Sequence, residues 1–123
     1  ARFVADTGID ALAASVGTVH GFYKAEPKLD FDRIAELKRV CGVPLVMHGG
    51  SGLSREDTRA AIAAGIRKIN YFSYMSNAGV RAVEALIAEE HPKYFHALAN
   101  AATAAMQADA EAAMDMFSMA PSA

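Results

Sequence analysis

The chain has 123 residues, of which 53% are hydrophobic and 21% are charged, a composition typical of one folded domain and unlike that of a disordered tail. Its 12 basic and 14 acidic side chains are interspersed and give a net charge of -2, so no cationic block exists to neutralise phosphates and we expect no nucleic-acid partner. No apolar run reaches the roughly 18 residues of a membrane span and no secretory signal is evident, so we expect a cytoplasmic protein with no membrane partner.

The first residues predict the end of a helix. Residues 1–7 resemble the last helical turns, and Gly8 is a predicted C-terminal cap. A helix end in this position predicts that further chain precedes it, so we expect the sequence to be a portion of a longer protein. The single cysteine, Cys41, precedes Gly42 at a predicted helix end and is expected to be a small packed residue.

Predicted strands and helices alternate along the chain. Residues 9–17 form a nearly continuous apolar run that ends in glycine, as expected of a strand buried on both faces. Asp30 is a predicted N-cap for a helix whose apolar residues are spaced by three and four, and Gly42 ends it. Residues 43–47 form the second predicted strand, which runs directly into His48.

The second half of the chain continues the alternation. Ser54 opens a predicted helix whose first turn carries two acidic residues, which suit the helix dipole. Residues 66–73 are the third predicted strand, and residues 76–90 the helix after it. The tail, residues 91–119, is also predicted to be helical, with an apolar stripe along one side.

This alternation predicts an α/β fold. Strand and helix repeat at a spacing of roughly 25 to 30 residues, which is typical of right-handed parallel βαβ units. Three strands cannot close a (β/α)8 TIM barrel, which needs eight strands and about 250 residues. We therefore expect the C-terminal part of such a barrel, strands six to eight, in residues 1–90, followed by a helical extension in residues 91–123. A separate doubly wound domain also fits, although its sheet would have two unpaired edges.

Polar residues follow each of the three predicted strands. His20 follows the first strand, His48 the second, and Asn70 with Ser73 the third. In α/β sheets the active site lies at the carboxyl ends of the strands. Neighbouring strands are about 4.8 Å apart, so two imidazoles at adjacent strand ends can bind one zinc ion. The alternative is that each is an ordinary loop histidine, which spacing alone slightly favours because no short metal-binding motif is present.

The loop after the second strand is rich in glycine. Gly49, Gly50 and Gly52 let the backbone approach a ligand closely, and Ser51 adds a hydroxyl group. The start of the helix just beyond offers N–H groups and a positive dipole end to a phosphate. The alternative is a flexible strand-to-helix turn; the position of the loop directly after His48 favours the phosphate site.

Four ordered motifs resemble the class II, zinc-dependent aldolases of fructose- or tagatose-bisphosphate. The motifs read VGTVHGFYK at residues 16–24, PKLDF at 27–31, PLVMHGGSG at 44–52 and KIN at 68–70. Their order and spacing match the family over about residues 3–72, whereas the helical tail matches only in general character. The family's fold is the TIM barrel expected above.

The resemblance implies a role for each matching residue. His20 and His48 correspond to zinc ligands. The positions that match those holding the dihydroxyacetone phosphate part of the substrate are Gly21, Gly49, Ser51, Asn70 and Ser73, with Gly50 in the same loop. The family's third histidine and the aspartate that donates a proton lie in the first half of the barrel, so no catalytic proton donor is expected among these residues.

The activity implied by the resemblance is the reversible aldol cleavage of a ketose 1,6-bisphosphate. Zn2+ acts as Lewis acid on the ketose carbonyl. A monovalent cation, Na+ or K+, is implied near the same loops, and a homo-oligomer, dimer or tetramer, is expected. With two of three zinc ligands, residues 1–123 alone are predicted to be inactive.

Two other functions remain open at this stage. One is a phosphosugar-binding protein that keeps the aldolase scaffold without its chemistry. The other is a segment that only completes a barrel with another chain, a role for which polar groups at three strand ends would be unnecessary. One departure from the family concerns the substrate: Tyr71 and Phe72 add bulk after Asn70, either to select a sugar phosphate or to pack within the barrel.

Overall fold

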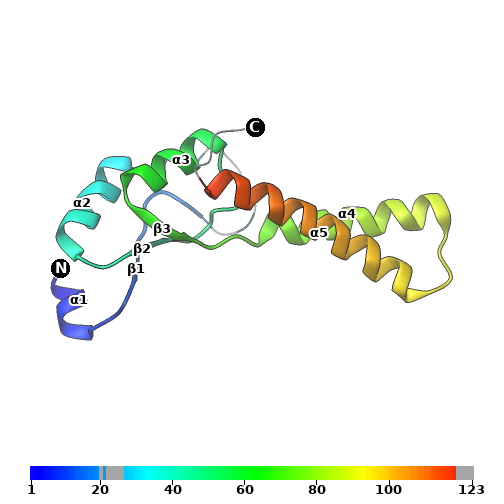
Figure 1. Ribbon diagram of the computed structural model, residues 1–123, viewed down its shortest axis with the longest axis horizontal. Coiled ribbons are helices and arrows are strands. Elements are labelled where there is room, and N and C mark those ends of the chain that lie inside the picture. The colour runs from blue at the N-terminus through cyan, green and yellow to red at the C-terminus, as the bar shows by residue number, and fades with distance from the viewer. Residues whose placement is uncertain (20, 22–26, 119–123) are drawn as a thin grey trace. The chain divides into compact units, whose positions relative to one another are not determined.

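The computed structural model describes residues 1–19, 21 and 27–118 and divides into two compact units, Ala1–Tyr71 and a second that begins at Phe72 (Figure 1). The first unit is α/β and the second is helical. The elements in chain order are α1 (Arg2–Thr7), β1 (Leu12–Ala13), α2 (Phe31–Cys41), β2 (Leu45–Met47), α3 (Arg55–Ala64), β3 (Ile66–Ile69), α4 (Ser73–Glu90) and α5 (Phe95–Phe117).

The three strands form one parallel sheet in the order β1-β2-β3. Leu12 pairs with Leu45, and Leu45 pairs in turn with Ile66. The predicted α/β fold with parallel βαβ units is therefore confirmed. The strands are shorter than predicted, above all β1, because the chain turns soon after it: Gly17 has φ 99, and the carbonyl of Val16 accepts from Asp30 N–H at 3.0 Å.

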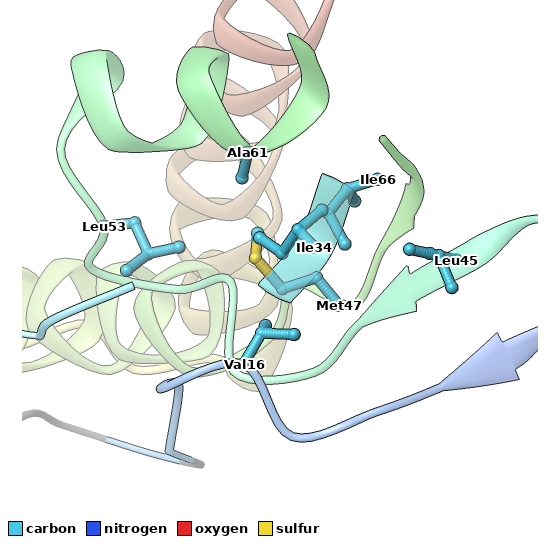
Figure 2. Close-up of a cluster of buried hydrophobic side chains, with 7 residues drawn as sticks. All are labelled: Val16, Ile34, Leu45, Met47, Leu53, Ala61 and Ile66. Carbon is cyan, nitrogen blue, oxygen red and sulfur yellow. The ribbon is translucent and has the colours of Figure 1, made fainter. Parts of the chain in front are cut away.

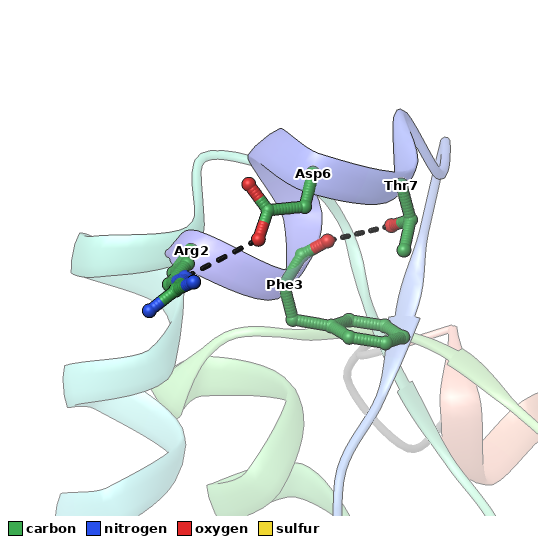
Figure 3. Close-up of polar contacts among 4 residues, drawn as sticks. All are labelled: Arg2, Phe3, Asp6 and Thr7. Carbon is green, nitrogen blue, oxygen red and sulfur yellow. Dashed lines mark hydrogen bonds and ion pairs between the residues drawn. The ribbon is translucent and has the colours of Figure 1, made fainter.

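Helix α1 ends where the sequence predicts. Gly8 has φ 66, a left-handed conformation that glycine adopts without strain, and its N–H donates to the Val4 carbonyl. Figure 3 shows two local contacts of this helix, from Arg2 Nε to Asp6 Oδ2 at 3.3 Å and from the Thr7 hydroxyl to the Phe3 carbonyl at 2.6 Å. The ion pair is exposed, so it contributes little stability.

Side-chain caps fix the starts of the two helices that cover the sheet. Asp30 caps α2 by accepting from Arg33 N–H at 2.9 Å, and Ser54 caps α3 by accepting from Asp57 N–H at 3.0 Å. Both caps lie where the sequence predicts them, because Asp and Ser side chains accept from N–H groups that lack a helical partner. Cys41 ends α2 and is buried, as expected of a small packed residue.

The core lies between one face of the sheet and helices α2 and α3. Figure 2 shows its seven buried side chains, which are Val16, Ile34, Leu45, Met47, Leu53, Ala61 and Ile66. Ile34 of α2 and Ala61 of α3 are completely buried against this face, as is Met47 of β2. The opposite face of the sheet, here called the open face, carries the alternate residues, including Val46 of β2 and exposed Lys68 of β3.

An irregularity in β3 determines which of its residues point to the open face. Leu45 pairs with Ile66, but the next residue, Val46, pairs with Lys68, so Arg67 is an extra residue in the strand. Such a β-bulge changes the phase of the alternation. Ile66 and Ile69, three residues apart, therefore both pack on the core. Lys68 and Asn70 lie on the side of the open face.

The second unit is a pair of packed helices. Helix α4 begins at Ser73, three residues earlier than predicted, and packs along α5. Gly79 allows the close approach: a Cβ there would lie 2.9 Å from Met106 Cγ. Among the described residues, no helix is long and apolar enough to cross a membrane. The predicted assignment of α4 to the barrel and of residues 91–123 to an extension stays a prediction, and the compact units divide earlier, after Tyr71.

Candidate active site

His48 and Asn70 meet at the carboxyl end of the sheet. His48 directly follows β2, and Asn70 directly follows β3. Asn70 Nδ2 lies 3.0 Å from His48 Nδ1 and 3.4 Å from His48 Nε2. Two of the residues that the sequence places at strand ends are thus in direct contact, as parallel neighbouring strands require.

The loops after β1 and β2 touch at Val19 and Gly49. A Cβ on Gly49 would lie 2.1 Å from the Val19 carbonyl oxygen, so only glycine permits this approach. Gly49 also has φ 66, which glycine adopts without strain. His20, the other predicted zinc ligand, lies outside the described residues. Val19, the residue before it, lies against Gly49, the residue after His48.

The loops after β2 and β3 are equally close. Gly50 N–H donates to the Asn70 carbonyl at 3.1 Å, and Asn70 N–H donates to the Met47 carbonyl at 2.9 Å. A Cβ on Gly50 would lie 2.3 Å from Ile69 Cγ2. The two glycines after His48 therefore serve one purpose each: Gly49 admits the loop after β1, and Gly50 admits the end of β3.

The side-chain amide of Asn70 is held at both ends. Its Oδ1 accepts a hydrogen bond from the ammonium group of Lys68, and its Nδ2 faces His48. An ammonium group can only donate, so the carbonyl end of the amide has to face Lys68 and the N–H2 end has to face the imidazole. The facing ring nitrogen of His48 then carries a lone pair, because an N–H2 group cannot accept.

The glycine-rich loop suits a phosphate better than the helix behind it. Ser51 is 4% exposed, and both Gly49 and Gly52 have positive φ and no Cβ, so their backbone can approach a phosphate closely. The N-terminus of α3, however, is capped by Ser54 and has Glu56 and Asp57 in its first turn. These groups already satisfy its dipole and oppose a second anion. The α3 N-terminus is therefore the weakest part of the phosphate site that the sequence predicts.

The N-terminus of α4 has the opposite character. Its first residue is Ser73, its N-cap is Phe72, which has no side-chain acceptor, and its first turn contains no acidic residue. A helix end of this kind is favourable to an anion. Ser73 belongs to the second unit, whereas Asn70 belongs to the first. Of the two added aromatic residues, Tyr71 is half-buried and Phe72 is 65% exposed.

Other predicted positions are less constrained. Gly21 has φ 85, and a Cβ there would meet nothing within 4 Å. Among residues 1–19, 21 and 27–118, no three His, Cys, Asp or Glu side chains gather in a group that could hold a metal ion. Lys68 is the residue that sequence reasoning missed. The signal was the spacing of Ile66 and Ile69, which conflicts with a regular strand and indicates a bulge.

Comparison with known proteins places these features in a family context. Residues 1–121 match the family described as fructose-bisphosphate aldolase class-II. The structure is similar to that of the YdjI aldolase from Escherichia coli K12, with a TM-score of 0.84 and 34% identity over 94% of this chain and 42% of that one. A proposed fructose-1,6-biphosphate aldolase from Coccidioides immitis gives a TM-score of 0.80 and 30% identity over 95% of this chain and 41% of that one.

A third solved structure supports the fold alone. The fructose-bisphosphate aldolase Fba of Campylobacter jejuni gives a TM-score of 0.74 at 20% identity, over 88% of this chain and 39% of that one. The chain thus spans about two fifths of the length of these solved relatives.

Proposed function

The chain belongs to the class II fructose-bisphosphate aldolase family, whose model matches residues 1–121. We propose that the chain supplies part of the active site of a metal-dependent aldolase. The proposed reaction is the reversible cleavage of a ketose 1,6-bisphosphate to dihydroxyacetone phosphate and glyceraldehyde 3-phosphate. Since the chain spans 42% of the length of the YdjI aldolase, the activity and substrate of the whole protein are part of this proposal.

The observation that carries the proposal is the contact between the loops at the carboxyl end of the sheet. Val19 lies against Gly49, and Asn70 lies against His48. The resemblance of the sequence to class II aldolases assigns metal and substrate roles to the residues at these positions. Physical contact between the three loops supports those assignments, because a metal and its substrate have to be held by all of them at once.

The donor set fits zinc. His48 and His20 are the proposed ligands from this chain, and imidazole nitrogen is a preferred zinc ligand. The third histidine and the proton donor are proposed to lie outside residues 1–123. When bound, Zn2+ would polarise the ketose carbonyl as a Lewis acid.

The chain's own residues bind and orient the substrate. Gly49 and Gly50 allow the backbone to approach a phosphate, Ser51 supplies a hydroxyl group, and the Asn70 N–H2 group can donate to a substrate oxygen. Ser73 is a further substrate contact that the family resemblance assigns. Gly21 is the proposed contact from the loop after β1. Binding energy from the phosphate then serves to orient the reacting carbons.

Further parts of the proposal rest on the family resemblance. They are a monovalent cation, Na+ or K+, near the loops, a homo-oligomeric assembly and a cytoplasmic enzyme of sugar metabolism. Tyr71 and Phe72 follow Asn70 directly and are the proposed source of any difference in sugar preference. Assays with both epimers, fructose and tagatose 1,6-bisphosphate, would identify the substrate.

Substitution of His48 tests the proposed function. In the longest form in which the protein is expressed, His48→Ala should lower cleavage of the bisphosphate more than 100-fold, because it removes a metal ligand. His96→Ala is the matched control: His96 is an exposed histidine in α5 and should keep activity within about twofold. A chelator should abolish cleavage and zinc should restore it. If the protein bound a phosphosugar but cleaved none, this result would contradict the enzyme hypothesis and support a non-catalytic binding protein.

A further inference from the structure

Lys68 contacts the candidate active site although nothing in the family motifs gives it a role. The extra residue Arg67 in β3 changes the phase of the strand, so that Lys68 and Asn70 lie on the same face, two residues apart. The Lys68 ammonium group donates to Asn70 Oδ1. The side chain of Lys68 is exposed, so its position is not explained by burial in the core.

The contact determines how Asn70 presents its amide. The main chain of Asn70 is fixed on both sides, by Met47 and by Gly50. For a side chain that lies between Lys68 and His48, the choice that remains is which end of the amide, the carbonyl or the N–H2 group, faces each of them. With a donor-only group at one end, the amide has a single satisfactory orientation, and its N–H2 group faces His48.

We propose that Lys68 is a positioning residue that holds the Asn70 amide with its N–H2 end toward His48 and the substrate. The inference rests on the proposed aldolase function of this site. An amide carbonyl in the same place would repel the oxygens of a phosphate or a carbonyl group, whereas the N–H2 end donates to them. Lys68 acts through Asn70 and does not itself contact the substrate.

A simpler role for Lys68 would be general attraction of an anionic substrate. Arg67 offers the matched control, because it is an adjacent exposed cation on the same strand, and its Nη1 donates to the carbonyls of Ile62 and Ile66 instead of to Asn70. Attraction by charge would raise KM in Lys68→Met and Arg67→Met alike and leave kcat unchanged. Positioning predicts a loss of kcat in Lys68→Met alone.

The orientation is measured first, without substrate. In 15N-labelled protein, nuclear Overhauser contacts should link the Asn70 N–H2 hydrogens to the ring hydrogens of His48. These contacts should disappear in Lys68→Met, persist in Arg67→Met and return in Lys68→Arg, which keeps a donor. Their persistence in Lys68→Met would overturn the proposal. Since this measurement needs no catalysis, it stays decisive even if the protein is not an aldolase.

Kinetics in the longest expressed form then test the consequence. Lys68→Met should lower kcat about tenfold with KM changed less than threefold, and Lys68→Arg should recover most of the loss. In an Asn70→Ala background, adding Lys68→Met should change kcat by less than about twofold, because the residue through which Lys68 acts is gone. Equal effects of Lys68→Met with and without Asn70 would overturn the positioning role. Absence of cleavage in the unsubstituted protein would instead contradict the proposed function.

Discussion

Individual residues set the spacing of the loops at the carboxyl end of the sheet. A side chain on Gly49 would collide with Val19 in the loop after β1, and a side chain on Gly50 would collide with Ile69 at the end of β3. The placement of the two glycines after His48 was readable from the sequence, because a glycine-rich loop after a strand indicates close approach of a backbone. The neighbours that they admit, Val19 and Asn70, were not readable, since contacts between loops depend on how the strands pair.

Comparing alanine substitutions at Gly42 and Gly49 separates the loss of stability caused by collision from the loss caused by backbone strain. Gly42 and Gly49 have similar positive φ, 70 and 66, but a Cβ on Gly42 would meet nothing within 4 Å. Gly42→Ala should therefore destabilise the protein by about 1 kcal/mol, from strain alone. Gly49→Ala should cost about 3 kcal/mol, because the Val19 backbone also has to move. Urea denaturation of both variants measures the difference, and equal costs would contradict the close contact of the two loops.

At the scale of elements, the sequence predicted each helix and strand that the described residues form, but not every boundary. Helices α2 and α3 begin where Asp30 and Ser54 predict, because capping depends on local chemistry alone. Strand lengths were overestimated, because an apolar run does not show where pairing stops. The bulge at Arg67 was missed, since a strand was assumed where the isoleucine spacing opposes a regular one. The sequence showed the two acidic residues in the first turn of α3. That this helix end disfavours a phosphate follows from the structure, in which Ser54 already caps it.

Helix α2 provides a test of capping. Asp30 accepts from Arg33 N–H and also forms an exposed ion pair with the Arg33 side chain at 3.3 Å. Asp30→Ala removes both and should lower the free energy of unfolding by about 1 kcal/mol. Asp30→Asn keeps an acceptor for the cap and should cost only about 0.3 kcal/mol, because an exposed ion pair is weak. Thermal and urea unfolding compare the two, and similar losses would mean that the ion pair dominates.

At the scale of the whole molecule, the sheet carries three parallel strands and covers one face with α2 and α3. The family to which the chain belongs and the solved relatives of 0.84 and 0.80 TM-score agree with the predicted part of a (β/α)8 barrel. Barrel membership could be predicted because the βαβ alternation and the motifs at the strand ends agree. The metal site stays a prediction, since the resemblance assigns some of its groups to other regions of the family fold.

Because some of the expected metal ligands lie in other regions of the family fold, residues 1–123 alone should behave differently from a complete aldolase. They should show no detectable cleavage of a ketose bisphosphate, because they are expected to provide two of the three zinc ligands and no proton donor. A calorimetric titration with Zn2+ should show weak binding at most. Tight one-to-one binding by this chain alone, or cleavage above the rate without protein, would mean that the site is complete within these residues.

The extra residue in β3 has a consequence for comparison with relatives and for redesign. A homologue that is one residue shorter between Ile66 and Ile69 would keep both isoleucines on the core side with an ordinary ladder, so an alignment gap at Arg67 is structurally neutral. A deletion directly after Ile69 would instead remove Asn70 and place Tyr71 in its position beside His48. Deletion scanning across this short segment should therefore preserve the fold when Arg67 is removed and abolish the contact with His48 when Asn70 is removed.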